Sequence, residues 1–180
     1  MKIIFTFILL ACFGVTHAQT NYYTVTKTFN EDGYAYQCDV STSDYVKLYN
    51  KTSRFISVRQ QYKDGRPLDD KFYNMPRSYH VEDESWTRPK CYSIVKNAFE
   101  SFDKKRLKGK SLTISLYIDS TTGKVADVEF NFVTFDPFAT VPLSIYRNIE
   151  VEIKKHIYFR PTSEGNKLNY MFLFWQQKIE

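Results

Sequence analysis

Few side chains in this sequence combine the types and the spacing that a catalytic or metal site needs. Of three histidines, only His80 and His156 lie beyond the first eighteen residues, so a multi-histidine zinc site cannot be built. His80 precedes the acidic run Glu82–Glu84, which could bind a hard cation weakly, although a solvated loop is the simpler interpretation. Glycine-rich phosphate loops, dinucleotide fingerprints and Gly-x-Ser-x-Gly motifs do not occur. We therefore predict a protein that is not an enzyme and has no catalytic, cofactor-binding or metal-binding residues.

Two cysteines, Cys38 and Cys91, offer a second kind of chemistry. In an exported protein they allow a single disulfide, which would contribute roughly 4 kcal/mol in the chain-entropy model. The alternative is a pair of buried free thiols that pack as small hydrophobic side chains. A nucleophilic pair would need a histidine beside Cys91, and no pattern in the sequence places one there. We predict the disulfide and keep the free thiols as the alternative.

The first eighteen residues have the three parts of a signal peptide. Met1-Lys2 is a basic start, Ile3–Val15 is an apolar run, and small residues precede a cleavage point between Ala18 and Gln19. The apolar run is shorter than the ~20 residues that a spanning helix needs, so we expect no stable membrane span. The sequence predicts an exported protein, periplasmic or extracellular in a Gram-negative bacterium. Alternatively, Leu9-Leu10-Ala11-Cys12 is similar to a bacterial lipobox, which would leave a lipid anchor at Cys12.

Composition limits the class of the mature chain. Of 180 residues, 43% are hydrophobic and 17% aromatic, while glycine and proline number only 6 each. Such a chain is neither collagen-like nor disordered, and it is long enough to bury a core. The net charge of +5 is spread evenly along the sequence, so we expect no nucleic-acid partner.

Alternating β-branched and aromatic residues predict an antiparallel meander in the first part of the mature chain, residues 19–66. Asp32-Gly33 supplies the positive φ angles that a tight hairpin needs. Residues 67–88 have no clean period and contain Pro67 and Pro76, with Pro89 directly after them, and we expect an irregular connection there. The expected strands are 22–29, 34–40, 45–49 and 55–62.

From residue 89 to the end, the pattern predicts a helix–strand–strand–helix–strand unit, which gives an α+β fold. The last strand is apolar on both faces, so we expect helices to cover one face and the meander or a partner to cover the other. The expected elements are a helix from Pro89 that ends in the basic run 104–110, strands at 112–118 and 128–132, a helix at 143–157 and a strand at 168–175.

The element order over residues 89–180 resembles the C-terminal domain of TonB-like proteins. Ser115–Val128 looks like the first hairpin of that family, and Ile157–Pro161 looks like its Phe-x-Pro after the second helix. Ser163–Leu168 looks like the turn into its last strand. The chain departs from the family in lacking a long proline-rich linker and an uncleaved anchor, and Arg88-Pro89-Lys90-Cys91-Tyr92 stands where the family has Tyr-Pro.

The resemblance implies a binding mode: the edge of the last strand accepts an extended peptide as an added strand. In this sequence that edge would lie along Asn169, Met171, Leu173 and Trp175. The expected function is therefore that of a secreted interaction module with a protein or peptide partner. The alternative at this edge is that the N-terminal meander covers it.

A second functional hypothesis comes from the tyrosines of the meander. Tyr34, Tyr36, Tyr45 and Tyr49, if exposed, could stack on sugars, which would make the protein a carbohydrate or small-ligand binder. Packing in the core or across strands is the competing interpretation.

Overall fold

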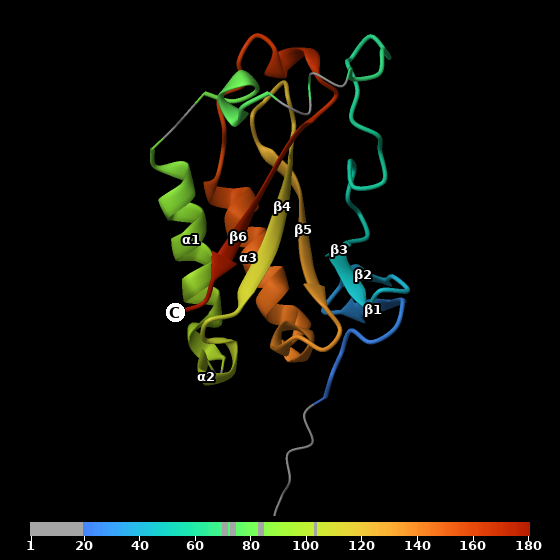
Figure 1. The fold of residues 1–180 in the computed structure, drawn as a ribbon, viewed down its shortest axis with the longest axis vertical. Helices are drawn as coiled ribbons and strands as arrows, with labels where there is room; N and C mark the ends of the chain where they lie inside the picture. Colours follow the sequence, from blue (N-terminus) through green and yellow to red (C-terminus); the bar gives the residue numbers. More distant parts are fainter. Residues whose placement is uncertain (1–19, 70–71, 73–74, 83–84, 103) are drawn as a thin grey trace, which may run out of the picture.

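A computed structural model places six antiparallel strands in one sheet, with both long helices on the same side of it (Figure 1). The structure describes residues 20–69, 72, 75–82, 85–102 and 104–180. The predicted signal peptide, its cleavage point at Ala18 and Gln19, the possible lipid anchor at Cys12, and the acidic residues Asp83 and Glu84 lie outside the described residues. The α+β class and the N-terminal β-meander are confirmed.

The strands follow the order β1-β2-β3-β5-β4-β6, so the meander β1–β3 joins the sheet through the β3–β5 pair. Its three strands extend the sheet at the side away from β6 and do not cover a face of the last strand. Only the loop at 55–61, which belongs to the same predicted region, contacts Asn169 and Tyr170 just before β6. The strands are β1 (Lys27–Glu31), β2 (Tyr34–Val40), β3 (Tyr45–Asn50), β4 (Ser111–Ile118), β5 (Val125–Val133) and β6 (Met171–Lys178), and the helices are α1 (Thr87–Ala98), α2 (Lys104–Leu107) and α3 (Leu143–His156).

The core lies between the sheet and the helices because alternate strand residues share one face. Leu48, Ile114 and Phe130 point to the helices and are fully buried. The α3 residues Tyr146 and Ile149, spaced as the sequence predicted, are fully buried against them. On the other face, polar side chains lie opposite one another across neighbouring strands. This row consists of Lys47, Asn131, Thr113 and Gln176.

Several element boundaries differ from expectation, among them the start of β1, which lies at Lys27 and not at Tyr22. Residues 55–62 do not form a strand, because Asp127 accepts hydrogen bonds from the backbone N–H groups of Arg54 (2.8 Å) and Phe55 (2.7 Å) and holds this segment as a loop. The last strand begins three residues later than predicted, at Met171. The first helix ends at Ala98 and continues as a 3-10 turn before α2.

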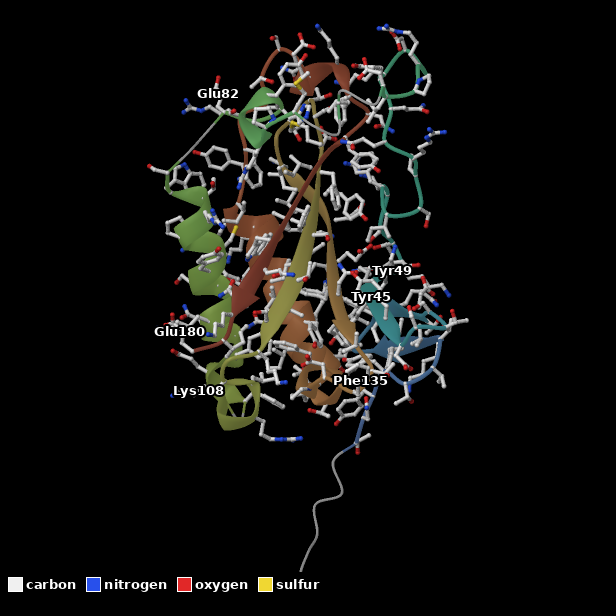
Figure 2. All side chains as sticks on the ribbon, viewed as in Figure 1. Tyr45, Tyr49, Glu82, Lys108, Phe135 and Glu180 are labelled. Atoms are coloured by element: carbon white, nitrogen blue, oxygen red, sulfur yellow. The ribbon has the colours of Figure 1, made fainter. Side chains whose placement is uncertain are left out.

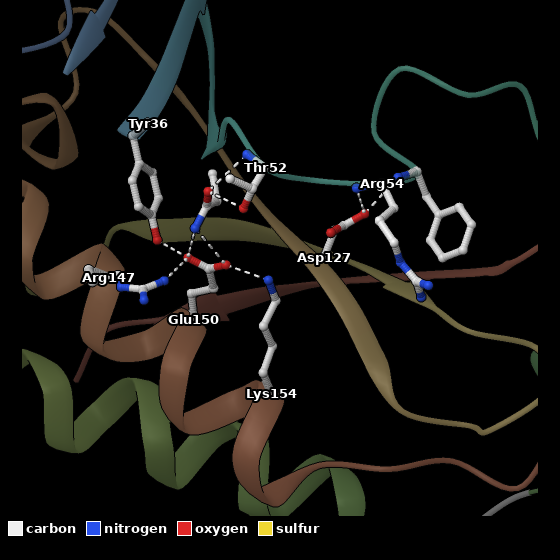
Figure 3. A network of polar contacts seen from close by, with 9 residues as sticks. Tyr36, Thr52, Arg54, Asp127, Arg147, Glu150 and Lys154 are labelled. Atoms are coloured by element: carbon white, nitrogen blue, oxygen red, sulfur yellow. Dashed lines mark hydrogen bonds and ion pairs between the residues drawn. The ribbon is translucent and has the colours of Figure 1, made fainter. Parts of the chain in front are cut away.

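A buried carboxylate ties α3 to the meander (Figure 3). Glu150 is fully buried and accepts hydrogen bonds from the hydroxyl of Tyr36 on β2 and from Asn50 Nδ2 on β3 (3.4 Å). Arg147 Nη1 and Lys154 Nζ, one turn away on either side, lie 3.1 and 2.5 Å from its oxygens. Burial raises the pKa of Glu150 above its ordinary value, although Lys154 acts to lower it.

The prediction of a disulfide is wrong, because Cys38 and Cys91 are free, buried thiols. Cys38 lies on β2, and Cys91 on α1 faces β6 in a cavity that both elements line. Because β2 and β6 are four strand spacings apart, roughly 19 Å, the thiols are far beyond the ~7 Å between Cα atoms that a disulfide allows. The two cysteines instead fit the alternative drawn from the sequence, a pair of buried free thiols that pack as small hydrophobic side chains.

We expect both thiols to stay inert in the folded protein. Burial raises the pKa of each to about 11, which keeps them protonated at neutral pH. Iodoacetamide followed by peptide mapping should modify Cys38 and Cys91 only after unfolding, and dithiothreitol should leave the melting temperature unchanged. A disulfide-linked peptide, or a melting temperature that falls by several degrees on reduction, would contradict this assignment.

None of the helices in the described part of the chain is long and apolar enough to cross a bilayer.

Candidate functional site

The two edges of the sheet differ in what they present to solvent. β1 forms one edge with five residues that include Lys27 and Glu31. β6 forms the other edge with eight residues, and Met171–Trp175 within it carry no charge. Charged side chains and short length protect an edge from pairing with other strands, and this stretch of β6 has neither. The edge of β6 is therefore the less protected of the two.

A groove runs between β6 and α1, which lie side by side (Figure 1). It contains a cavity of about 360 Å³, lined by Tyr92 and Lys96 of α1 and by residues that follow Trp175. A second cavity of about 200 Å³ is lined by Arg88 and Cys91 of α1 and by Leu173 and Trp175 of β6. We call the two cavities together the α1–β6 groove.

A side-chain bridge crosses the groove between its cavities. Gln177 Nε2 on β6 donates to the carbonyl oxygen of Tyr92 on α1 (2.9 Å). The Tyr92 ring lies 6.5 Å from that of Trp175, and its hydroxyl accepts from Arg88 Nε (3.0 Å). The Gln177 hydrogen bond and the Tyr92–Trp175 ring contact therefore join helix and strand across the groove.

Positive charge gathers in the groove. Arg77 and Arg88 line the smaller cavity and Lys96 lines the larger one, while the side chain of Lys178 shares the strand face of Gln176, away from the helices. The one acidic residue among the described lining residues is Glu180, at the C-terminus beside the end of α1 (Figure 2). The Cys91 thiol is not a nucleophile at neutral pH, because burial raises its pKa to about 11. The site therefore suits binding by hydrogen bonds, packing and charge.

The four residues predicted for partner binding fall in three environments. Leu173 and Trp175 are half-buried and line the smaller cavity together. Met171 is fully buried in the core. Asn169 precedes β6 and is held by the 59–61 loop: its Oδ1 accepts from Gln61 N (3.0 Å) and its Nδ2 donates to Arg59 O (2.9 Å). The structure brings Leu173 and Trp175 to the groove and leaves the other two outside it.

Aromatic side chains of β6 also reach the side of the sheet away from the helices. Phe172 is 38% exposed and Phe174 is 66% exposed. Their rings lie 6.1 Å apart, and Phe172 packs against Tyr117 of β4 at 5.2 Å. A strand added beside β6 would therefore meet the groove on one of its faces and these two rings on the other.

The tyrosines of the carbohydrate hypothesis are divided between core and surface. Tyr36 is fully buried, and Tyr34 is half-buried under the guanidinium of Arg147, 4.9 Å from its ring. Tyr45, 39% exposed, and the half-buried Tyr49 share the face away from the helices (Figure 2). Of the four, Tyr36 is out of reach of a ligand and Tyr45 is the most exposed.

Several groove residues were not singled out from the sequence. Arg77 lies in the connection that was read as irregular, and no local signal marks it. Arg88 and Tyr92 belong to the segment where the chain departs from the TonB-like pattern, and that departure was the available signal. Among the residues that the structure describes, no three His, Cys, Asp or Glu side chains are grouped so that they could hold a metal ion. Half-buried His80 packs instead against Phe72, 4.4 Å between ring centres.

Comparisons with known proteins give a family and a structural relative. The family model described as "Domain of unknown function (DUF5043)" matches residues 19–175. A crystal structure of a DUF5043 family protein from Bacteroides uniformis is similar to this chain, with 38% sequence identity and a TM-score of 0.82 over 88% of each chain. No curated protein matches the sequence.

Proposed function

We propose that this chain, which belongs to the DUF5043 domain family, is an exported, non-enzymatic interaction protein that captures an extended peptide along the free edge of β6. The observation that carries the proposal is the long edge strand with its uncharged Met171–Trp175 stretch, placed beside the α1–β6 groove. Export rests on the leader sequence, and the family match begins at Gln19, the first residue after the predicted cleavage point.

The spacing of the groove supports strand addition. On the helix side of β6, Leu173 and Trp175 line one cavity, while Gln177 and Ile179 line the other. Side chains on one face of a strand repeat every two residues, or about 6.8 Å. A peptide alongside β6 would therefore direct alternate side chains into the two cavities, and its main chain would supply the hydrogen bonds that give affinity. The resemblance to TonB-like domains points to the same mode.

Carbohydrate binding is the second candidate, and the exposure of Tyr45 and Tyr49 on one face favours keeping it. A glycan array separates it from peptide capture. Signal that disappears in a Tyr45→Ala variant would favour the carbohydrate function.

Alternate N-methylation of a peptide tests strand addition without changing the protein. Successive N–H groups of a strand point to opposite edges. The probe is a fluorescein-labelled decapeptide of alternating glutamine and valine. Two methylated versions of it are made: in one, the backbone amides of the odd-numbered residues carry N-methyl groups, and in the other, those of the even-numbered residues do. We call these two versions the two phases. One phase should abolish binding, because it removes the donors facing β6, and the other should leave binding unchanged.

A protein variant locates the site. Trp175→Glu should weaken binding of the unmethylated peptide at least about tenfold, because it removes a large ring that lines the smaller cavity. Val151→Lys, at an exposed apolar position on α3 (38%) that does not line the groove, is the control and should bind as the wild type does. Equal binding of both methylated phases would rule out strand addition. Unchanged binding of the peptide by Trp175→Glu would show that the peptide binds away from the α1–β6 groove.

A further inference from the structure

We propose that the side of the sheet away from the helices carries a second binding site, for a neutral oligosaccharide. The site rests on two buried polar side chains of β5, Glu129 and Asn131, and on aromatic rings of β3 and β6 at either side of them. It is separate from the α1–β6 groove and does not depend on peptide capture. It gives the carbohydrate candidate a defined place on the molecule.

Glu129 and Asn131 lie in the middle of a sheet face that neither long helix covers (Figure 1). Phe130 between them points to the helices, so these two side chains point the other way. The register places them in neighbouring rows that run across β3, β5, β4 and β6. One row consists of Tyr49, Glu129, Ser115 and Phe174, and the other of Lys47, Asn131, Thr113 and Gln176.

Glu129 is a buried carboxylate with few partners. It is 4% exposed, and among the described residues a single donor reaches it, the Tyr117 hydroxyl at 3.1 Å. By contrast, two neutral donors and two cations hold Glu150 in the core. A buried carboxylate without a cation destabilises a fold, so folding alone does not account for Glu129. The hydroxyl groups of a ligand would supply the missing hydrogen bonds.

Asn131 adds a second acceptor on the same face. It is 4% exposed, its Nδ2 donates to Ser115 Oγ (3.3 Å), and its Oδ1 has no hydrogen-bond partner in the described part of the chain. Buried polar atoms are paired in nearly all native proteins, because leaving one unpaired costs free energy. Opposite Asn131 on β3 is Lys47, an exposed side chain that can move aside when a ligand enters.

Aromatic rings lie at both ends of the rows. On β6, Phe174 is 66% and Phe172 38% exposed, and on β3 Tyr45 is 39% exposed beside the half-buried Tyr49 (Figure 2). Such rings pack against the C–H faces of sugars. Because β3 and β6 are three strand spacings apart, roughly 14 Å, one sugar ring cannot contact both ends. An oligosaccharide is long enough to do so.

The charges on this face favour a neutral ligand. Lys47 and Lys178 share the face with Glu129. The two lysines would repel a cation, and the buried carboxylate would repel an anion. A sugar carries many donors and no charge, so it satisfies Glu129 and Asn131 without either repulsion.

A carboxylate variant tests the site. A glycan array of neutral oligosaccharides selects the probe, and calorimetric titration with the strongest-binding member gives the affinity. Glu129→Gln should weaken binding at least about tenfold, because it removes the charged acceptor. It should leave the melting temperature unchanged or raise it, because the buried charge that it removes has no cation beside it. Glu152→Gln, on α3 at the other side of the sheet, is the matched control and should bind as the wild type does.

A ring variant tests the aromatic end. Phe174→Ala should weaken binding of the same oligosaccharide about fivefold, because the sugar loses a packing surface. Phe135→Ala, at a phenylalanine that is 78% exposed in the turn after β5, is the matched control and should leave binding unchanged. Added salt should not change the affinity of the wild type, because the ligand is neutral.

Four results would overturn the site: an array on which no neutral glycan binds, unchanged binding by Glu129→Gln, a lower melting temperature of that variant, or an affinity that falls steeply with salt. The site and the proposed function fail separately. Trp175→Glu should keep oligosaccharide binding, and Glu129→Gln should keep binding of the glutamine–valine peptide. Loss of both ligands in either variant would show that the sheet face and the groove are one site.

Discussion

Replacing Gly123 with alanine should lower the free energy of unfolding by about 3–4 kcal/mol, measured by urea denaturation. Two physical effects add. A φ angle of +71° costs an L-residue about 1–2 kcal/mol. A Cβ atom on Gly123 would also lie 1.8 Å from the carbonyl oxygen of Phe159, a backbone atom that cannot rotate away. Forcing that contact apart should cost about 1–3 kcal/mol more.

The backbone at Gly123 has little freedom to adjust. Its N–H donates to Asp119 O (2.8 Å), and its carbonyl accepts from Phe159 N (2.8 Å). This contact joins the β4–β5 turn to the segment that follows α3, so relief of the clash would move one of them.

Gly109→Ala is the matched control. Gly109 has a φ of +79° and no atom within 4 Å of the added Cβ, so the variant shows the conformational cost alone, about 1–2 kcal/mol. If the two variants lose the same stability, the close approach at Phe159 does not constrain the fold.

Replacing Glu150 with alanine should cost about 3 kcal/mol, the second large effect. The change leaves the Tyr36 hydroxyl and Asn50 Nδ2 without their acceptor in the core, and each unsatisfied group costs about 1–3 kcal/mol. Arg147 and Lys154 lose less, because their side chains are about 30% exposed and remain hydrated (32% and 29%). Glu152→Ala, on the same helix at 39% exposure, is the control and should change stability by less than about 0.5 kcal/mol.

The pH dependence of Glu150 has a definite sign. Burial raises its pKa in the folded protein, so between its ordinary value of 4.5 and the raised value the folded state binds more protons than the unfolded state. Stability from this group is therefore fully present below that window and is lost as pH rises through it. Glu150→Gln cannot ionise, so the difference in unfolding free energy, wild type minus variant, should fall across the window. A difference that rises with pH would show that Arg147 and Lys154 dominate over burial.

Local patterns were sufficient for most secondary elements of this chain. The spacing of Leu143, Tyr146, Ile149 and Ile153 predicted α3 and its buried face, and alternation predicted β4 and β5. Asp32 and Gly33 do take the positive φ angles that their types favour. The prediction of a strand at residues 55–62 failed. These residues alternate as a strand does, but the Asp127 carboxylate accepts hydrogen bonds from the backbone of Arg54 and Phe55, just before and at the start of that segment.

The sequence by itself determined the α+β class, the face that each main element buries, and the apolar character of the last strand. The order of strands was decided only by the tertiary structure, because every strand offers the same backbone donors and acceptors and side-chain alternation does not name the neighbour. That order puts Cys38 and Cys91 too far apart to bond, leaves β6 at an edge, and sets it beside α1. Arg77, Arg88, Lys96 and Trp175 line one groove because chain segments distant in sequence pack there, and no local pattern encodes that meeting.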